Sequence, residues 1–244
     1  MTAYLIGMNL ISSLAYFTTV DVIAVALIWL CWLTIGIRIE SGRLEPRSVS
    51  YIMRSYRREW MVQFITRQPR IFDASILASL RQGTTFFASA CMIAIGAGFA
   101  LIGNTERLLG IAEDFTLQEL PALVWETKIL MALIFVVNAF LKFVWSHRLF
   151  GYCSVVMAAV PNDENDPTAL PRARQAAELN ITGARAYNRG LRSMYFAIAA
   201  LTWLISPIAL LMAGPFTFLV LWRREFSSHS RTVILQNQPT PPEV

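Results

Sequence analysis

Residues 71–103 read IFDASILASLRQGTTFFASACMIAIGAGFALIG, and no proline interrupts this run of 33 residues. As one α-helix the run is roughly 50 Å long, whereas the hydrocarbon core of a bilayer is only about 30 Å thick. Roughly the first ten residues, which include Asp73 and Arg81, are therefore expected to stand outside the hydrocarbon. The remainder, about 82–103, predicts a membrane span.

Three more apolar stretches predict spans at about 20–37, 128–146 and 194–222. The chain is 55% hydrophobic and only 15% charged, whereas soluble domains have about 25% charged residues. We therefore predict an all-α integral membrane protein with four transmembrane helices in a single membrane domain, 1–244. The apolar pattern of the third stretch continues to Val160, so two of the helices are expected to extend into the cytoplasm as an antiparallel hairpin.

Positive charge is confined to some of the segments between these spans. Fifteen of the 21 Lys and Arg residues lie in 38–81 and 148–192, whereas 104–127 holds only Arg107 beside five acidic residues. Cytoplasmic segments of membrane proteins carry an excess of Lys and Arg. We therefore place 38–81 and 147–193 in the cytoplasm and 104–127 outside, as a short loop.

The C-terminal stretch leaves two topologies open. Four spans put both termini outside, with Arg223 and Arg224 as exceptions to the charge rule. Alternatively, 194–222 folds back at Pro207 as a re-entrant hairpin, whose non-helical backbone must then be buried in protein. The polar, proline-rich tail, 227–244, is expected to be mobile.

The chain start has no secretory-signal pattern, because the first 20 residues carry no Lys or Arg. Residues 3–18 are uncharged but partly polar, which favours an interfacial segment on the outer surface. Asp21 is expected to cap the first helix, where an acid interacts favourably with the helix dipole.

Residues 48–66 predict a cytoplasmic-surface amphipathic helix, in which apolar and aromatic residues recur every three or four positions beside arginines. Such helices tend to lie in the headgroup plane, where each basic residue near an anionic leaflet is worth about 1 kcal/mol. Alternatively, the apolar stripe packs on neighbouring helices of the same protein. The candidate membrane-surface residues are Arg54, Arg57, Arg58 and Trp60.

Ala90, Ala94 and Gly98 form a row of small residues at four-residue spacing in the second span. Such rows let helix backbones approach closely. The close contact lies either within one chain or between subunits, so a homo-oligomer is one expectation.

The third span carries the polar candidates Asn138 and Lys142, which share a helix face because they are four residues apart. Polar groups at membrane depth suggest a path for an anion or a proton, continued by His147 and Arg148. The alternative is an interhelical amide hydrogen bond and a lysine that snorkels to the interface. Asp73 is expected in a structural network of ion pairs with Arg81, Arg57 or Arg148.

Sequence motifs for chemistry are missing. There is no HExxH, GxSxG or Walker pattern. Cys31, Cys91 and Cys153 are scattered without a CxxC pair and are expected to be buried as small hydrophobes. We therefore predict no catalytic, cofactor-binding or metal-binding residues, and no nucleic-acid partner.

Six segments carry a resemblance to a known family. They are RREW at 57–60, RIFD at 70–73, GTTFFAS at 83–89, KFVWSHR at 142–148, WLISP at 203–207 and RREF at 223–226. Together they resemble the uncharacterised bacterial membrane family catalogued as domain of unknown function 599. The resemblance covers roughly Trp29 to Arg231 and implies a multi-span protein of the bacterial inner membrane, with no assigned activity.

These observations favour a non-enzymatic, oligomeric accessory or scaffold protein whose partners are the bilayer, its anionic headgroups and further copies of the chain. The alternative is a small ion channel or transporter with a polar path lined by the third span. A membrane enzyme that holds a phosphate-bearing lipid with its arginines is disfavoured, because no nucleophile and base stand out.

Overall fold

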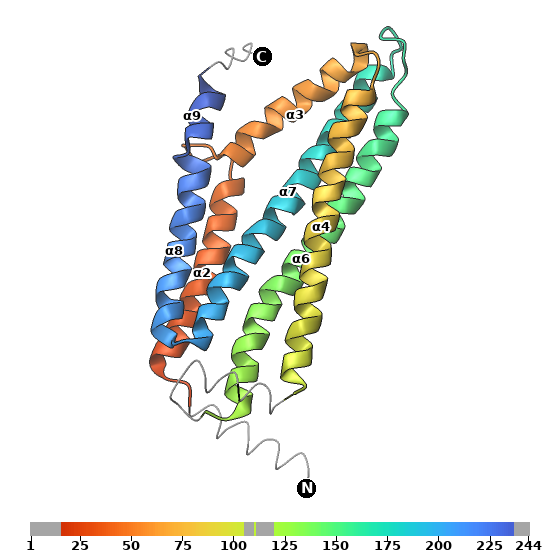
Figure 1. Cartoon of the computed structure of the whole chain (residues 1–244). Helices are drawn as coiled ribbons and strands as arrows, with labels where there is room; N and C mark the ends of the chain where they lie inside the picture. The colour runs from red at the N-terminus through yellow and green to blue at the C-terminus, as the bar shows by residue number, and fades with distance from the viewer. Residues whose placement is uncertain (1–15, 105–109, 111–119, 237–244) are drawn as a thin grey trace.

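The computed structural model describes residues 16–104, 110 and 120–236, and its regular elements within these residues are all helices. The expectations for residues 3–15, for most of the loop 104–127 and for 237–244 lie outside the described residues. Figure 1 shows long helices that run side by side in alternating directions. The helices are α2 (Thr19–Glu40), α3 (Val49–Thr66), α4 (Ile71–Ile102), α6 (Ala122–Ala158), α7 (Ala169–Leu201), η1 (Thr202–Leu204), α8 (Pro207–Phe226) and α9 (His229–Leu235).

Three of the helices, α2, α4 and α6, are long and apolar enough to cross a membrane. They contain the spans predicted at 20–37, 82–103 and 128–146, and they indicate a membrane-embedded multi-pass protein. With 32 and 37 residues, α4 and α6 are about 48 and 55 Å long, well beyond the thickness of the hydrocarbon. They lie antiparallel to each other (Figure 1), as the hairpin prediction requires.

The start of α2 is fixed by a capping box. The Asp21 amide donates to the Thr18 hydroxyl, and the Asp21 carboxylate accepts from the Thr18 amide at 2.8 Å. This reciprocal arrangement satisfies two amide donors that a helix start otherwise leaves without partners. The capping role predicted for Asp21 is confirmed. We call this end of the molecule the Asp21 end, and the opposite end, where α2 finishes, the Glu40 end.

The single span expected at 194–222 is wrong. Helix α7 ends at Leu201, η1 follows, and the chain turns at Ser206 before α8 begins at Pro207. Pro207 has no amide hydrogen and disfavours helical backbone in the residue before it, which favours the start of a new helix at this point. Ser206 is accordingly extended, and its hydroxyl accepts from the Ala209 amide at 3.0 Å, which caps the new helix.

Helix α8 returns alongside α2, so its two ends match those of α2 (Figure 1). At the Glu40 end, the guanidinium of Arg38 lies over the rings of Phe226 and Trp222, 4.5 and 5.5 Å from their centroids. Arg223 and Arg224 therefore lie at the same end as Arg38, not at the opposite end as the four-span topology requires.

Helix α7 is the central helix, and a seam of small residues lets α6 approach it closely. A Cβ atom added at Gly190 would lie 2.7 Å from the Phe143 ring, and one at Gly183 would lie 3.0 Å from the Phe150 ring. The buried Ser146 hydroxyl donates to the Gly183 carbonyl at 2.7 Å. Helices α6 and α7 are therefore in close contact along this seam.

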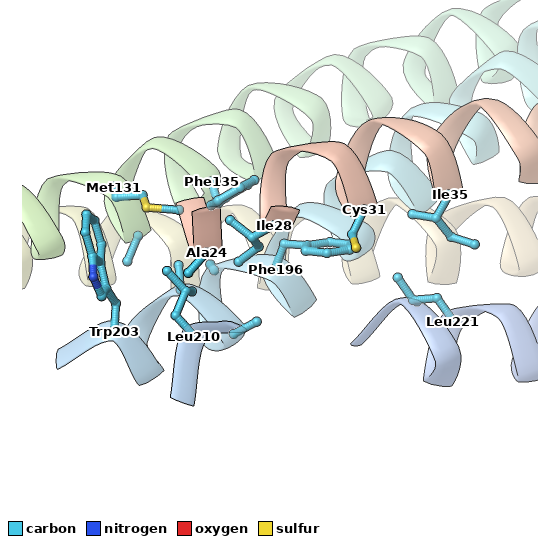
Figure 2. Packing of buried hydrophobic residues seen from close by; sticks show 14 of the residues in the cluster. Ala24, Ile28, Cys31, Ile35, Met131, Phe135, Phe196, Trp203, Leu210 and Leu221 are labelled. Atoms are coloured by element: carbon cyan, nitrogen blue, oxygen red, sulfur yellow. The ribbon is translucent and has the colours of Figure 1, made fainter. Parts of the chain in front are cut away.

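The two largest of four apolar clusters in the described residues hold most of the buried core. Figure 2 shows the first, which runs along α2 and in which Ile35 of α2 points toward Leu221 of α8. The second lies at the tips of α3, α4, α6 and α7 and includes Met61, Phe64 and Phe150. Each is a continuous buried core, and together they hold the long helices along most of their length.

The tail is ordered for two helical turns. Helix α9 begins at His229, and its Arg231 Nε donates to the Arg47 carbonyl at 3.0 Å. The Tyr56 hydroxyl donates to the Ile234 carbonyl at 3.3 Å. Residues 229–235 of the expected mobile tail therefore form a helix that lies against α3 and the segment before it.

Candidate functional site

An ion-pair triad stands where α2 finishes against α7. The carboxylate of Glu40 pairs with Arg189 and Arg192, and Arg189 Nε donates to it at 2.8 Å. The two arginines share a face of α7 because they are three residues apart. Arg192 is only 7% exposed, so its charge depends on this carboxylate.

The triad forms one wall of a cavity of about 310 Å³ between α2, α6 and α7, which we call the lateral cavity. Three cations, Lys142, Arg189 and Arg192, line it against one carboxylate, Glu40. The indole of Trp32 donates to the Ser193 hydroxyl at 3.3 Å along the same wall. The complete lining is Trp32, Leu33, Gly36, Ile37, Glu40, Asn138, Lys142, Arg189, Arg192 and Ser193.

A second cavity of about 240 Å³ lies on the other side of the triad, between α3 and α7, and we call it the arginine cavity. It shares Glu40 and Arg192 with the lateral cavity. Four guanidinium groups therefore converge on a small volume, and this concentration of like charge is its main chemical feature. The polar and charged lining is Glu40, Ser50, Arg54, Arg57, Arg185, Asn188 and Arg192.

The arginines of this cavity differ in what they contact. Arg57 bonds to the Asn180 side-chain oxygen, which is neutral. Burial lowers the pKa of the Arg57 guanidinium. Burial also lowers the pKa of Arg54, and repulsion from Arg185 lowers it further, although Glu40 acts in the opposite direction. The Nε atom of Arg185 is buried without a hydrogen-bond partner.

The polar candidates from the sequence separate into different places. Asn138 and Lys142 both line the lateral cavity. His147 lies in the seam between α4 and α6, where its Nδ1 is 3.2 Å from the Thr84 hydroxyl and its Nε2 is 3.5 Å from Arg81. These residues therefore do not form one continuous path.

The remaining two candidates lie apart from both cavities. Arg148 is exposed, and its Nε donates to the Tyr152 hydroxyl at 2.5 Å. Asp73 is fully buried and pairs with Arg67, while the Trp60 indole donates to it at 2.6 Å. The expected partners of Asp73, namely Arg81, Arg57 or Arg148, are wrong, because the short connection between α3 and α4 places Arg67 nearer.

The candidate membrane-surface residues on α3 mostly face α7. Arg57 contacts Asn180, and Arg58 forms an exposed ion pair with Glu178 at 2.7 Å. Trp60 contacts Asp73 and Arg54 lines the arginine cavity, so all four have contacts inside the chain. The structure therefore shows packing of this helix on its neighbours, and its place in the headgroup plane stays a prediction.

The small-residue row on α4 lines an apolar groove against α6 and α7. Ala90, Ala94 and Gly98 all contribute to this groove, which has a volume of about 370 Å³. Among these three residues, Gly98 is the glycine at a close approach to α6, since an added Cβ atom would lie 2.6 Å from the Leu133 side chain. The cysteines at 31, 91 and 153 are buried and free, as expected.

Sequence reasoning missed Glu40 as the centre of the site. The sequence does place Arg185, Arg189 and Arg192 on one face of a helix, and an acidic residue at the end of the first span was the available signal. The contact between Glu40 and these arginines could not be predicted from the spacing of residues in the sequence, because 149 positions separate Glu40 from Arg189.

Long apolar helices that alternate in direction, with a pair of cationic cavities at one end, define a multi-pass helical membrane protein. The chain belongs to the family described as "Protein of unknown function, DUF599", whose profile matches residues 23–230. A comparison with curated proteins found no match, and a comparison with solved structures found none either.

Proposed function

We propose that the chain is an accessory protein of the bacterial inner membrane that binds the anionic headgroup of a membrane lipid in the lateral cavity. The observation that carries the proposal is the lining of that cavity, where Lys142, Arg189 and Arg192 face a single carboxylate. Two cationic charges are thus left over for a phosphate group. Arginine and lysine form strong charge-assisted hydrogen bonds with phosphate oxygens.

The position of the cavity favours a lipid as the occupant. Leu33 and Ile37 line it and are 52% and 72% exposed, on the outer face of an apolar helix. No atom lies within 4 Å of a Cβ built at Gly36, so the wall is open there. A headgroup beside the cations would leave its acyl chains against these exposed apolar side chains.

The proposed orientation places the Glu40 end in the cytoplasm, where the charge rule puts Lys and Arg. In this orientation the last turns of α7 and the whole of α8 supply two further crossings beyond α2, α4 and α6. Five crossings bring Arg223 and Arg224 to the cytoplasmic side, which removes the exceptions that four spans required. The support is that α8 matches α2 end for end.

The test measures which phospholipids stay with the full-length protein purified in an uncharged detergent. We expect retention of phosphatidylglycerol over phosphatidylethanolamine, and a fall of about fivefold in Lys142→Gln, since one basic contact is worth about 1 kcal/mol. Arg148→Gln is the matched control, because Arg148 is an exposed cation on the same helix, outside the cavity. Equal retention in Lys142→Gln and the unchanged protein would count against the proposal.

Assembly with further copies is a second proposed property, and it is favoured by α4. Only 6% of the apolar window of α4 is buried inside the chain, against 44% for α6. Mass measurement of the particle in mild detergent tests this property. Ala94→Trp, which places a bulky side chain on α4, is expected to weaken the complex. A strictly monomeric particle in the unchanged protein would contradict the proposed assembly.

One observation supports the alternative that the chain is a small ion channel or transporter. The lateral cavity and the arginine cavity share Glu40 and Arg192, so they meet across this ion pair. Liposomes that contain the protein test the alternative directly. Anion flux above that of empty vesicles, altered in Lys142→Ala, would support it, and flux equal to empty vesicles would reject it.

A further inference from the structure

We propose that the arginine cavity is a second, separate binding site, which takes the phosphate group of a small solute from the aqueous phase at the Glu40 end. The cavity is built mainly from α3, which is not among the helices apolar enough to span a membrane, and from residues 181–192 of α7, which precede the apolar last turns of that helix. Its ligand therefore arrives from water. The observations behind this site are separate from those behind the lipid site, although the two cavities share Glu40 and Arg192.

The charges of the cavity are not balanced by the chain itself. Glu40 already accepts from Arg189 and Arg192 with its two carboxylate oxygens. Among the residues that the structure describes, no ion pair involves Arg54, Arg57 or Arg185. Three guanidinium groups thus face a shared volume without a carboxylate of their own, and an oxyanion placed there would supply the missing counter-charge.

The hydrogen-bonding capacity of these groups is also unused. The Nε atom of Arg185 is buried and has no partner, and a buried donor without an acceptor costs free energy. Within the described residues, Arg54 donates a long hydrogen bond of 3.4 Å to the Glu40 carbonyl, and its guanidinium lies over the Tyr51 ring, 4.5 Å from the centroid. A planar guanidinium donates two parallel hydrogen bonds to phosphate, so both arginines are suited to this acceptor.

Neutral donors and one further acid complete the surroundings. The Ser50 amide and hydroxyl donate to Glu225 at 3.0 and 2.9 Å, and the Asn188 side chain donates to the Ser50 hydroxyl at 3.3 Å. Glu225 is therefore held on the Ser50 side. With Glu225 included, the surroundings of the cavity contain two carboxylates, Glu40 and Glu225, and four guanidinium groups.

The size of the cavity limits the ligand. Its volume of about 240 Å³ is below the roughly 300 Å³ at which pockets for drug-sized ligands begin. The site therefore fits a phosphate group with a small organic part, and it excludes a large cofactor.

The test titrates inorganic phosphate into the full-length protein in an uncharged detergent, with chloride at matched ionic strength as the reference. We expect a saturable rise in melting temperature with phosphate only. Arg185→Gln is expected to weaken this binding by about tenfold or more, because it removes a charge-assisted bond. Arg54→Gln serves the same purpose if Arg185→Gln does not fold.

Arg58→Gln is the matched control, since Arg58 lies on α3 outside the cavity and pairs with Glu178. It is expected to bind phosphate like the unchanged protein. No phosphate-specific shift in the unchanged protein, or an equal shift in Arg185→Gln, would overturn the proposal.

A second arm separates a solute from a lipid headgroup. The protein is placed in nanodiscs of phosphatidylcholine with and without phosphatidylglycerol, and the phosphate titration is repeated. Saturable binding of phosphate in both discs supports an aqueous ligand. Stabilisation by phosphatidylglycerol alone that is lost in Arg185→Gln would assign the cavity to a headgroup and overturn the aqueous source.

Discussion

The indole of Trp203 donates its Nε1 hydrogen to the carboxylate of Asp21, with 2.7 Å between the two heavy atoms. Both side chains are at least 95% buried, and 182 residues separate them in the sequence. This bond holds the turn between α7 and α8 beside the first turn of α2. The return of the chain at Pro207 therefore reaches the Asp21 end, which is why α8 can run the full length of α2.

The first prediction concerns the position of the C-terminus. A topology reporter fused after residue 236 is expected to respond like one inserted at residue 43 and unlike one inserted at residue 115. The physical reason is that Arg38 lies against Trp222 and Phe226, so α8 finishes where α2 finishes. Alkaline phosphatase activity and fluorescence of a cytoplasmic protein are the paired measurements. A C-terminal fusion that matched the fusion at 115 would exclude the five-crossing topology.

The second prediction concerns the seam between α6 and α7. Gly190→Ala is expected to lower the free energy of unfolding by about 1–3 kcal/mol, because the new methyl group would meet the Phe143 ring. The measurement is unfolding of the purified protein in mixed micelles of increasing denaturing detergent.

Gly151→Ala is the control for that measurement. Gly151 lies inside α6 with no atom within 4 Å of an added Cβ. Alanine is the better helix former by about 0.5–1 kcal/mol, so this variant is expected to be slightly more stable. Equal effects of the two substitutions would show that α6 and α7 are not in close contact.

The third prediction concerns the triad. Glu40→Gln is expected to destabilise the protein by about 2–3 kcal/mol, because it leaves the Arg192 charge buried without a carboxylate. The value is set below that of a fully buried pair because 19% of the Glu40 side chain is exposed. Thermal unfolding followed by tryptophan fluorescence gives the shift.

Glu178→Gln tests whether burial is the cause. The Arg58–Glu178 pair is 57% exposed on both sides, and exposed pairs contribute at most about 0.5–1 kcal/mol. Its loss is expected to change stability only slightly. A loss as large as that in Glu40→Gln would show that the two pairs are equally buried and would contradict the structure.

Much of the helical framework follows from the sequence because it depends on local properties. The length of the apolar stretches predicted the three helices that are apolar enough to cross a membrane. The run from 71 to 102 is a single helix, and no proline interrupts it. Asp21 was expected to cap α2 because an acid at a helix start interacts favourably with the helix dipole, which is a local effect. Such features need no knowledge of what a helix packs against.

The features that failed depend on packing between distant segments. Small-residue rows occur on both α4 and α7, and the sequence does not say which helix each row meets. Both meet α6, since Gly98 of α4 lies against Leu133, and Gly183 and Gly190 of α7 lie against phenylalanine rings. The turn at Ser206 was one of two open topologies, and it is accompanied by a contact between Trp203 and Asp21, far away in the chain.

Glu40 and Arg192 belong to the walls of both cavities. An anion in either cavity draws on the same guanidinium and repels an anion in the other. Occupancy of the two is therefore thermodynamically linked with a negative sign, and by reciprocity each ligand weakens the other by the same factor. Under the two proposals, an aqueous anion in the arginine cavity would therefore weaken the retention of a lipid headgroup in the lateral cavity.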